Sequence, residues 1–165
     1  MSIKLDSITL DKRSINNYEK LDKKLLATDL ILMLLSVSPI KGNTKLQKQV
    51  FLAWKKIFSD VTVDLGYYPW KFGAYSRSVE DSMKFLIKRK FVKIKPGKGE
   101  SLMYILTNSG KQHIQEKLYE LGLDMRSLPD KKLDWDDWDT KGTLIHVYRN
   151  YPEYTAKTKV PSLKW

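Results

Sequence analysis

The chain contains no cysteine, which excludes disulfides, thiolate zinc sites, iron–sulfur clusters and cysteine nucleophiles together. Its two histidines, His113 and His146, lie more than 30 residues apart and have no nearby nucleophile or carboxylate at motif spacing. A dedicated transition-metal site needs several such ligands close together. We therefore predict no metal and no cofactor.

Long apolar runs are also absent. The longest one, Leu30–Leu35, is far shorter than the roughly 18 to 20 residues needed to cross a bilayer. The first ten residues are polar and do not resemble a secretory signal. These features predict a cytoplasmic protein without a membrane partner. The 165 residues, 42% of them hydrophobic, are enough for one globular domain with a core of its own.

Positive charge is abundant and unevenly distributed. The chain holds 30 Lys+Arg against 19 Asp+Glu, a formal net charge of +11. Residues 1–99 hold 20 basic and 9 acidic residues, whereas residues 100–165 hold 10 of each. Between Arg77 and Lys98, eight basic residues stand against two acids. A compact basic stripe indicates a surface that docks on nucleic acid, although lysines can also simply solvate a helix face.

The spacing of apolar residues predicts most of the secondary structure. Periods of three and four residues, with Ser, Thr or Asn at several starts and Pro or Gly at several ends, are typical of amphipathic helices. The pattern predicts helices over residues 21–37, 44–58, 76–90, 107–122 and 141–151.

The segments between these helices differ in character. Residues 59–75 lose the helical period and crowd aromatics around Gly66, Pro69 and Gly73, which indicates an ordered loop with a short extended piece. Two strand-like runs in residues 91–106 flank the turn PGKGE and predict a β-hairpin. Residues 128–140 are acidic and are expected to form a connecting loop.

Three helices followed at once by a hairpin are the arrangement of a winged helix-turn-helix. We therefore predict a mainly α fold with a small β-hairpin, a winged helix-turn-helix with additional N- and C-terminal helices. The predicted organisation is an N-terminal arm over 1–20, a winged-helix DNA-binding core over 21–122, and a C-terminal acidic loop, helix and tail over 123–165 packed on that core.

Several motifs resemble those of the YwgA-like proteins, small winged-helix proteins that are distantly similar to Panacea antitoxin domains. The matching stretches are TKLQKQVFLAWKKIF, WKFGAYS, YILTNSGKQHI and HVYRNYPEYTAKTKV, within residues 25–160. The junction YILTNSGK is also similar to one found in MarR-like and PadR-like regulators. Where the family typically shows Tyr-Gly-Pro-Tyr-Ser, this chain has Phe72 and Ala74 in place of Tyr and Pro. The resemblance implies a winged-helix fold and DNA binding, and it implies no catalytic residues.

A helix with a polar face can enter the major groove, and the helix over 76–90 is the expected reader. The basic wing over 91–106 would follow the backbone beside it. Glu80 and Asp81 lie on the same helix face and would repel phosphates unless they pair with Lys84. The predicted DNA-binding residues are Lys45, Lys48, Ser76, Arg77, Ser78, Lys84, Lys88, Arg89, Lys93, Lys95 and Lys98.

Two other clusters have alternative interpretations. The aromatics of residues 67–75 could stack on single-stranded bases, but packing of a core corner is the favoured interpretation. The Trp135-Asp136-Asp137-Trp138 segment resembles a catalytic carboxylate pair, yet no acid/base partner is adjacent. PGKGE lacks the ending of a phosphate-binding loop.

The sequence thus predicts a non-enzymatic protein that binds double-stranded DNA as a transcriptional regulator. We expect a homodimer, formed through the N-terminal helix or the segment after Gly122. The alternative is a protein-interaction module, antitoxin-like or adaptor, on the same scaffold. Its partner would bind at residues 67–75 or 135–138.

Overall fold

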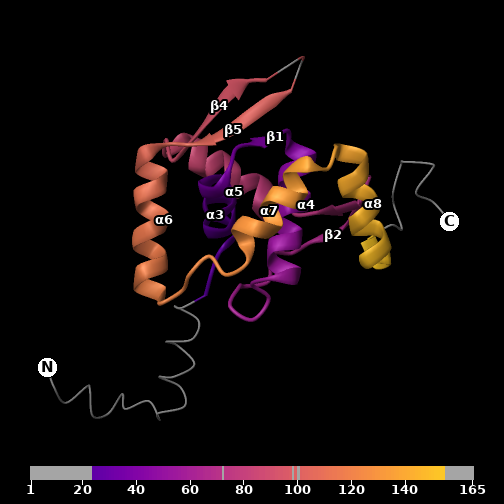
Figure 1. The fold of residues 1–165 in the computed structure, drawn as a ribbon, viewed down its shortest axis with the longest axis horizontal. Coiled ribbons are helices and arrows are strands. Elements are labelled where there is room, and N and C mark those ends of the chain that lie inside the picture. Colours follow the sequence, from indigo (N-terminus) through magenta and orange to yellow (C-terminus); the bar gives the residue numbers. More distant parts are fainter. Residues whose placement is uncertain (1–23, 72, 98, 100, 155–165) are drawn as a thin grey trace, which may run out of the picture.

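A computed structural model describes residues 24–71, 73–97, 99 and 101–154 (Figure 1). The predicted arm over 1–20, the C-terminal tail and Lys98 lie outside the described residues. The described part is mainly helical, with six α-helices and two small antiparallel sheets. In chain order the elements are α3 (Ala27–Val37), β1 (Ile40–Lys41), α4 (Asn43–Lys56), β2 (Tyr68–Trp70), β3 (Gly73–Tyr75), α5 (Arg77–Lys88), β4 (Val92–Pro96), β5 (Leu102–Leu106), α6 (Asn108–Leu121), α7 (Leu128–Asp137), α8 (Thr140–Asn150) and the 3-10 helix η1 (Pro152–Tyr154).

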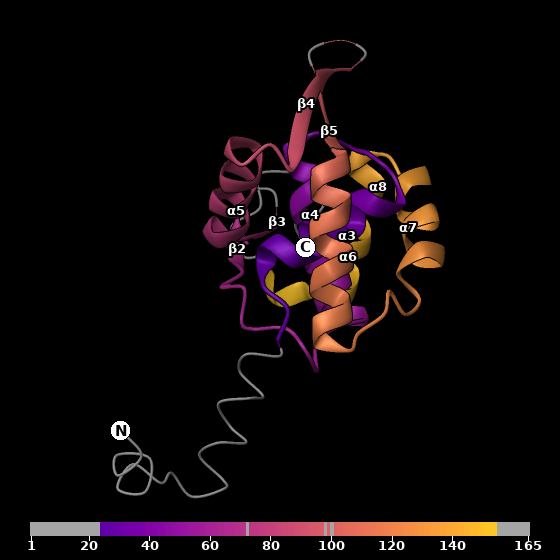
Figure 2. The same ribbon diagram turned by 90° about the vertical axis from the view of Figure 1, so that its left-hand side faces the viewer.

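Helix α3 forms the centre of the core. It is apolar nearly all the way round, and α4, α5, α6 and α7 each pack against it (Figure 2). It begins at Ala27, so the predicted helix is absent from residues 24–26, and residues 21–23 lie outside the described residues. Leu25 instead pairs with the loop before β2, donating its N–H to the Val61 carbonyl oxygen at 2.7 Å and accepting from Val63 N–H at 3.0 Å. These backbone hydrogen bonds hold Leu25 in an extended conformation, so the helix begins after it.

The three-stranded sheet has the order β1-β5-β4, antiparallel throughout. The predicted hairpin is confirmed as β4 and β5, which project from the helices at the top of Figure 1. Strand β1 was not predicted because its two residues, Ile40 and Lys41, are too few to show a period. They pair with Tyr104 and Met103 of β5. The connection between α3 and α4 therefore supplies the third strand of the sheet that contains β4 and β5.

A second hairpin, β2 and β3, follows α4 and contains the expected short extended piece. It turns next to the buried ring of Tyr148 in α8. Gly73 has a φ of +87°, and a Cβ there would lie 2.2 Å from Tyr148 Cε1. Glycine is required at this position because both the conformation and the close approach exclude a side chain.

The prediction of a loop over residues 128–140 is wrong, because α7 occupies most of it. Pro129 stands in the first turn, where its missing N–H costs nothing. Leu128, Lys132 and Trp135 face inward at helical spacing, and all three are buried. Helix α7 was not predicted because its apolar stripe is narrow, has a lysine in its middle and lies in an acidic segment. Helix α8 begins one residue earlier than expected, with Asp139 as its cap.

Helices α7 and α8 pack on the rest of the fold: α7 contacts α3 and α4, and α8 contacts α4 and β3.

Glycine inside α6 allows another close approach, because a Cβ on Gly110 would lie 2.2 Å from the Phe91 carbonyl oxygen. None of the helices in the described ranges is long and apolar enough to cross a membrane.

Candidate nucleic-acid interface

Helix α5 turns a charged face to solvent and an apolar face to the core. Its cap is Ser76, whose Oγ accepts a hydrogen bond from Val79 N–H at 3.1 Å. Val79, Met83 and Leu86 are buried. The exposed residues of this helix are Arg77, Ser78, Asp81, Lys84, Phe85 and Lys88. Three cationic side chains therefore share one face with a single exposed acid.

The second acid of α5, Glu80, is partly neutralised by its neighbours. The Tyr75 hydroxyl donates a hydrogen bond to Glu80 Oε2, and Lys84 Nζ lies 3.6 Å from Glu80 Oε1. The hydrogen bond from Tyr75 and the charge of Lys84 hold the pKa of Glu80 below its usual value. The expected pairing with Lys84 is present, so Asp81 is the acid of this face that stays exposed.

Strand β4 adds two more cations. Lys93 and Lys95 are exposed on β4 and lie two residues apart, so both point to the same face of the strand. Arg89 is exposed where α5 ends, and the chain turns into β4 through Lys90, which has a φ of +62°. Helix α5 and strand β4 pack against each other. Six of the predicted DNA-binding cations are exposed on these two elements and their junction, where Lys90 is exposed as well: Arg77, Lys84, Lys88, Arg89, Lys93 and Lys95.

Two predicted DNA-binding residues, Lys48 and Ser76, are buried and not exposed as expected. Lys48 is 2% exposed and donates to the Ala74 carbonyl oxygen at 2.7 Å. Ser76 is fully buried, and its Oγ donates to the Leu65 carbonyl oxygen at 2.5 Å. The cause is the β2–β3 hairpin, which packs on α4 and covers the side of that helix expected to face solvent.

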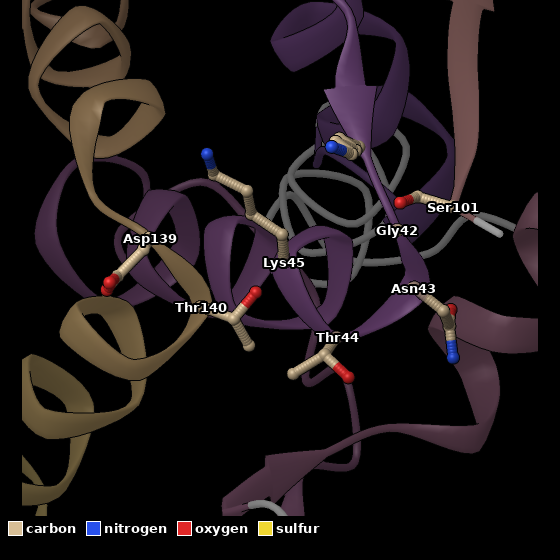
Figure 3. A pocket seen from close by; sticks show the side chains of 8 residues that line it. Gly42, Asn43, Thr44, Lys45, Ser101, Asp139 and Thr140 are labelled. Atoms are coloured by element: carbon tan, nitrogen blue, oxygen red, sulfur yellow. The ribbon is translucent and has the colours of Figure 1, made fainter. Parts of the chain in front are cut away.

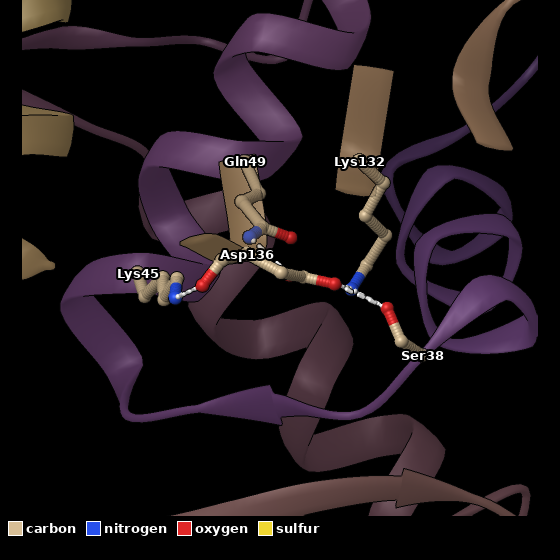
Figure 4. A network of polar contacts seen from close by, with 5 residues as sticks. All are labelled: Ser38, Lys45, Gln49, Lys132 and Asp136. Carbon is tan, nitrogen blue, oxygen red and sulfur yellow. Dashed lines mark hydrogen bonds and ion pairs between the residues drawn. The ribbon is translucent and has the colours of Figure 1, made fainter. Parts of the chain in front are cut away.

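Lys45 is half-buried and directed to α7, where its Nζ donates to the Asp136 carbonyl oxygen at 2.9 Å. It belongs to a polar network that sequence reasoning missed (Figure 4). Lys132 Nζ lies 2.9 Å from each carboxylate oxygen of Asp136, and the same carboxylate accepts from Gln49 Nε2 at 2.9 Å and from the Ser38 hydroxyl. The i, i+4 spacing of Lys132 and Asp136 was the available signal.

This network holds Asp136, in the acidic segment 135–138, within the fold. Burial alone would raise the pKa of Asp136, but hydrogen bonds from Ser38, Gln49 and Lys132 outweigh it and lower that pKa. Trp135 is 2% exposed, and Trp138 packs on the His146 ring. Most of the predicted protein-binding segment 135–138 is therefore engaged within the fold.

The aromatic loop is divided between core and surface. Tyr67 contacts Phe51 and Trp54, and its hydroxyl donates to the Gln47 carbonyl oxygen at 2.7 Å. Tyr68 and Trp70 remain 38% and 40% exposed. The packing interpretation thus describes the first aromatic of the loop, whereas the hairpin presents two others to solvent.

Two adjoining hollows lie beside the start of α4. The larger, of about 440 Å³, lies between α4, the end of β1 and the start of α8 (Figure 3). Its one acid, Asp139, accepts from Gly142 N–H at 2.6 Å as the cap of α8. The smaller, of about 240 Å³, lies between α4 and the β2–β3 hairpin. In the described part of the chain, no group of three or more histidine, aspartate or glutamate side chains could hold a metal ion.

Comparison with known proteins gives no family assignment: no family, no curated protein and no solved structure matches this chain significantly. The resemblance to YwgA-like proteins therefore stays a prediction that rests on the motifs quoted above.

Proposed function

We propose that this protein is a winged helix-turn-helix protein that binds double-stranded DNA and regulates transcription. The order of elements supports the fold. Helices α3, α4 and α5 are followed by the β4–β5 hairpin, and β1 lies between the first two helices and pairs with β5. This is the connectivity of a winged helix, with β2 and β3 inserted before the third helix.

The observation that carries the DNA-binding proposal is that six of the predicted DNA-binding cations are exposed on α5, its C-terminal end and β4. Helix α5 has the exposed polar face that a groove-reading helix needs, and Arg77 lies in its first turn, where base edges are reached. Lys93 and Lys95 would contact backbone phosphates. Lys48 and Ser76 are buried and take no part, and Lys45 is held by α7.

The dependence of affinity on salt tests this proposal. If all six cations neutralise phosphates, the slope of log K against log salt is about −5, from roughly −0.9 for each contact. We would measure binding of a fluorescent duplex by anisotropy between 50 and 300 mM KCl. The triple variant Arg77→Ala/Lys84→Ala/Lys88→Ala should reduce the slope by about 3, and Lys93→Ala/Lys95→Ala by about 2.

A matched control has the same loss of charge elsewhere. Lys131, Lys141 and Arg149 are exposed on α7 and α8, which follow α5 and the wing by more than 20 residues. Their triple alanine variant should keep the slope of the native protein. Absence of duplex binding at 50 mM KCl, or a control that loses as much slope as the α5 variant, would refute the proposal. Enrichment of one motif from a random duplex pool would establish sequence-specific regulation.

The proposed homodimer needs a surface other than the predicted N-terminal helix, because α3 is buried inside the fold. The segment after Gly122 remains, and there Leu133 of α7 is 60% exposed. Light scattering during size-exclusion chromatography would give the mass of the native protein and of Leu133→Lys. A native monomer, or an unchanged dimer in the variant, contradicts this placement.

A further inference from the structure

The buried amine of Lys48 has no counter-charge among the residues that the structure describes. Its side chain is 2% exposed, and its one hydrogen bond within the described residues is to the neutral Ala74 carbonyl oxygen. No carboxylate in that part of the chain lies within ion-pair distance of it. Lys132, the other buried lysine, has a carboxylate at 2.9 Å. A buried ammonium without an anion is costly, so this arrangement leaves a place for one.

Lys48 lines the smaller hollow, and the other described residues around it carry no negative charge. They are Asn43, Thr44, Gln47, Trp70, Lys71 and Tyr75. Asn43 and Thr44 are the first two residues of α4, a helix whose cap, Gly42, offers no side-chain acceptor. The positive end of the helix therefore adds to the field of Lys48. Trp70 is 40% exposed, so the hollow has an aromatic wall and an opening to solvent.

We propose that this hollow binds a small organic anion, whose carboxylate or phosphate group contacts the Lys48 amine and whose flat apolar part packs against Trp70. The site is separate from the proposed DNA-binding cations and does not depend on them. The same chemistry could come from a DNA backbone phosphate. We assign it to a free small molecule because Lys48 is only 2% exposed, whereas a duplex backbone has to bind on an exposed surface.

Protonation supports the same assignment. Burial lowers the pKa of Lys48 to about 7, so a bound anion would draw a proton onto the amine. The other titratable groups at the hollow are Lys71 and Tyr75, with Glu80 bonded to the Tyr75 hydroxyl. Burial and the bond to Glu80 raise the pKa of Tyr75 to about 12, outside the range of the test.

The test uses inorganic phosphate, benzoate and phenyl phosphate with the full-length native protein in Tris chloride. The readout is the indole N–H signal of Trp70 in a proton–nitrogen spectrum, assigned with Trp70→Phe. We expect a saturable shift with benzoate or phenyl phosphate, and affinity at least tenfold weaker in Lys48→Met. For benzoate, which stays ionised, the affinity should fall on the order of 50-fold between pH 6 and pH 9, as Lys48 loses its proton.

Lys45→Met is the matched control, because Lys45 lies on the same helix and does not line the smaller hollow. It should bind the probes as the native protein does. A circular dichroism spectrum shows whether Lys48→Met is folded, and Lys48→Gln serves as a second variant. No saturable shift with any probe, equal affinity in Lys48→Met and Lys45→Met, or displacement of the probe by duplex DNA would overturn the proposal. Loss of DNA binding in the α5 variant would leave it unaffected.

Discussion

Replacing Lys48 by methionine should change how the stability of this protein depends on pH. Burial lowers the pKa of Lys48 to about 7, from 10.5 for an unburied lysine. Between these two values the unfolded chain therefore binds more protons than the folded one. Stability rises with pH wherever the unfolded state holds more protons, so it increases from pH 7 upward and is lost as the pH falls toward 7.

The size of this change in stability follows from the difference between the two pKa values of Lys48. A lysine with these two pKa values stabilises the folded chain by about 1 kcal/mol more at pH 8 than at pH 7, and by about 2 kcal/mol more at pH 9. Lys48→Met has no proton to lose and removes this dependence. It should also be more stable than the native protein at pH 7, since a buried uncompensated charge is replaced by an apolar side chain of similar length.

The assay is urea unfolding followed by tryptophan fluorescence at pH 6, 7, 8 and 9, in a chloride buffer that contains no organic anion. The informative quantity is the free energy of unfolding of the native protein minus that of Lys48→Met at each pH. Lys111→Met, which replaces an exposed lysine of α6, is the control and should keep the native dependence. A difference that stays constant from pH 7 to pH 9 would refute the argument, because Lys48 would then titrate alike in the folded and unfolded chains.

Two further substitutions test the close packing of Gly110 and the ion pair between Lys132 and Asp136. Gly110→Ala should destabilise the protein by about 1 to 3 kcal/mol in urea unfolding, because the alanine Cβ would meet the Phe91 carbonyl oxygen. This loss is expected although alanine is the better helix former. Equal stability of the variant and the native protein would contradict the close approach of Gly110 to Phe91. Asp136→Asn should cost about 3 kcal/mol at pH 7, since it leaves the buried Lys132 charge without its carboxylate. Because the pKa of Asp136 is lowered in the folded chain, its contribution is present above pH 4 and is lost as the pH falls through that lowered pKa. Asp136→Asn should therefore lose less stability than the native protein between pH 5 and pH 2. If the two proteins unfold in acid over the same pH range, Asp136 does not stabilise the fold through Lys132.

Sequence reasoning located the long helices and the β4–β5 hairpin because their apolar residues repeat at the periods of one covered face. It failed where the local pattern is short or mixed. Strand β1 has two residues, and it forms because the edge of β5 offers backbone partners. Helix α7 has a lysine at the centre of its inward face, and Lys132 is buried there because Asp136, one turn later, neutralises it.

The candidate site divides in the same way. Exposure of Arg77, Lys84 and Lys88 could be predicted, since the opposite face of α5 carries Val79, Met83 and Leu86. The environment of Lys48 could not. Its side of α4 is polar in sequence, and an amphipathic helix with one neighbour would leave it in water. Helix α4 has several neighbours, because strand β3 and α8 pack on it as well as α3.

The sequence by itself determined the helices with a continuous apolar stripe, the β4–β5 hairpin and the gathering of positive charge in the first 99 residues, because these properties depend on neighbours within a few positions of the chain. The tertiary structure alone decided that one lysine predicted to be exposed, Lys48, is buried. This burial depends on elements distant in sequence, here residues 68–75 against residue 48, and their contact turns one predicted DNA-binding lysine into a buried, uncompensated amine.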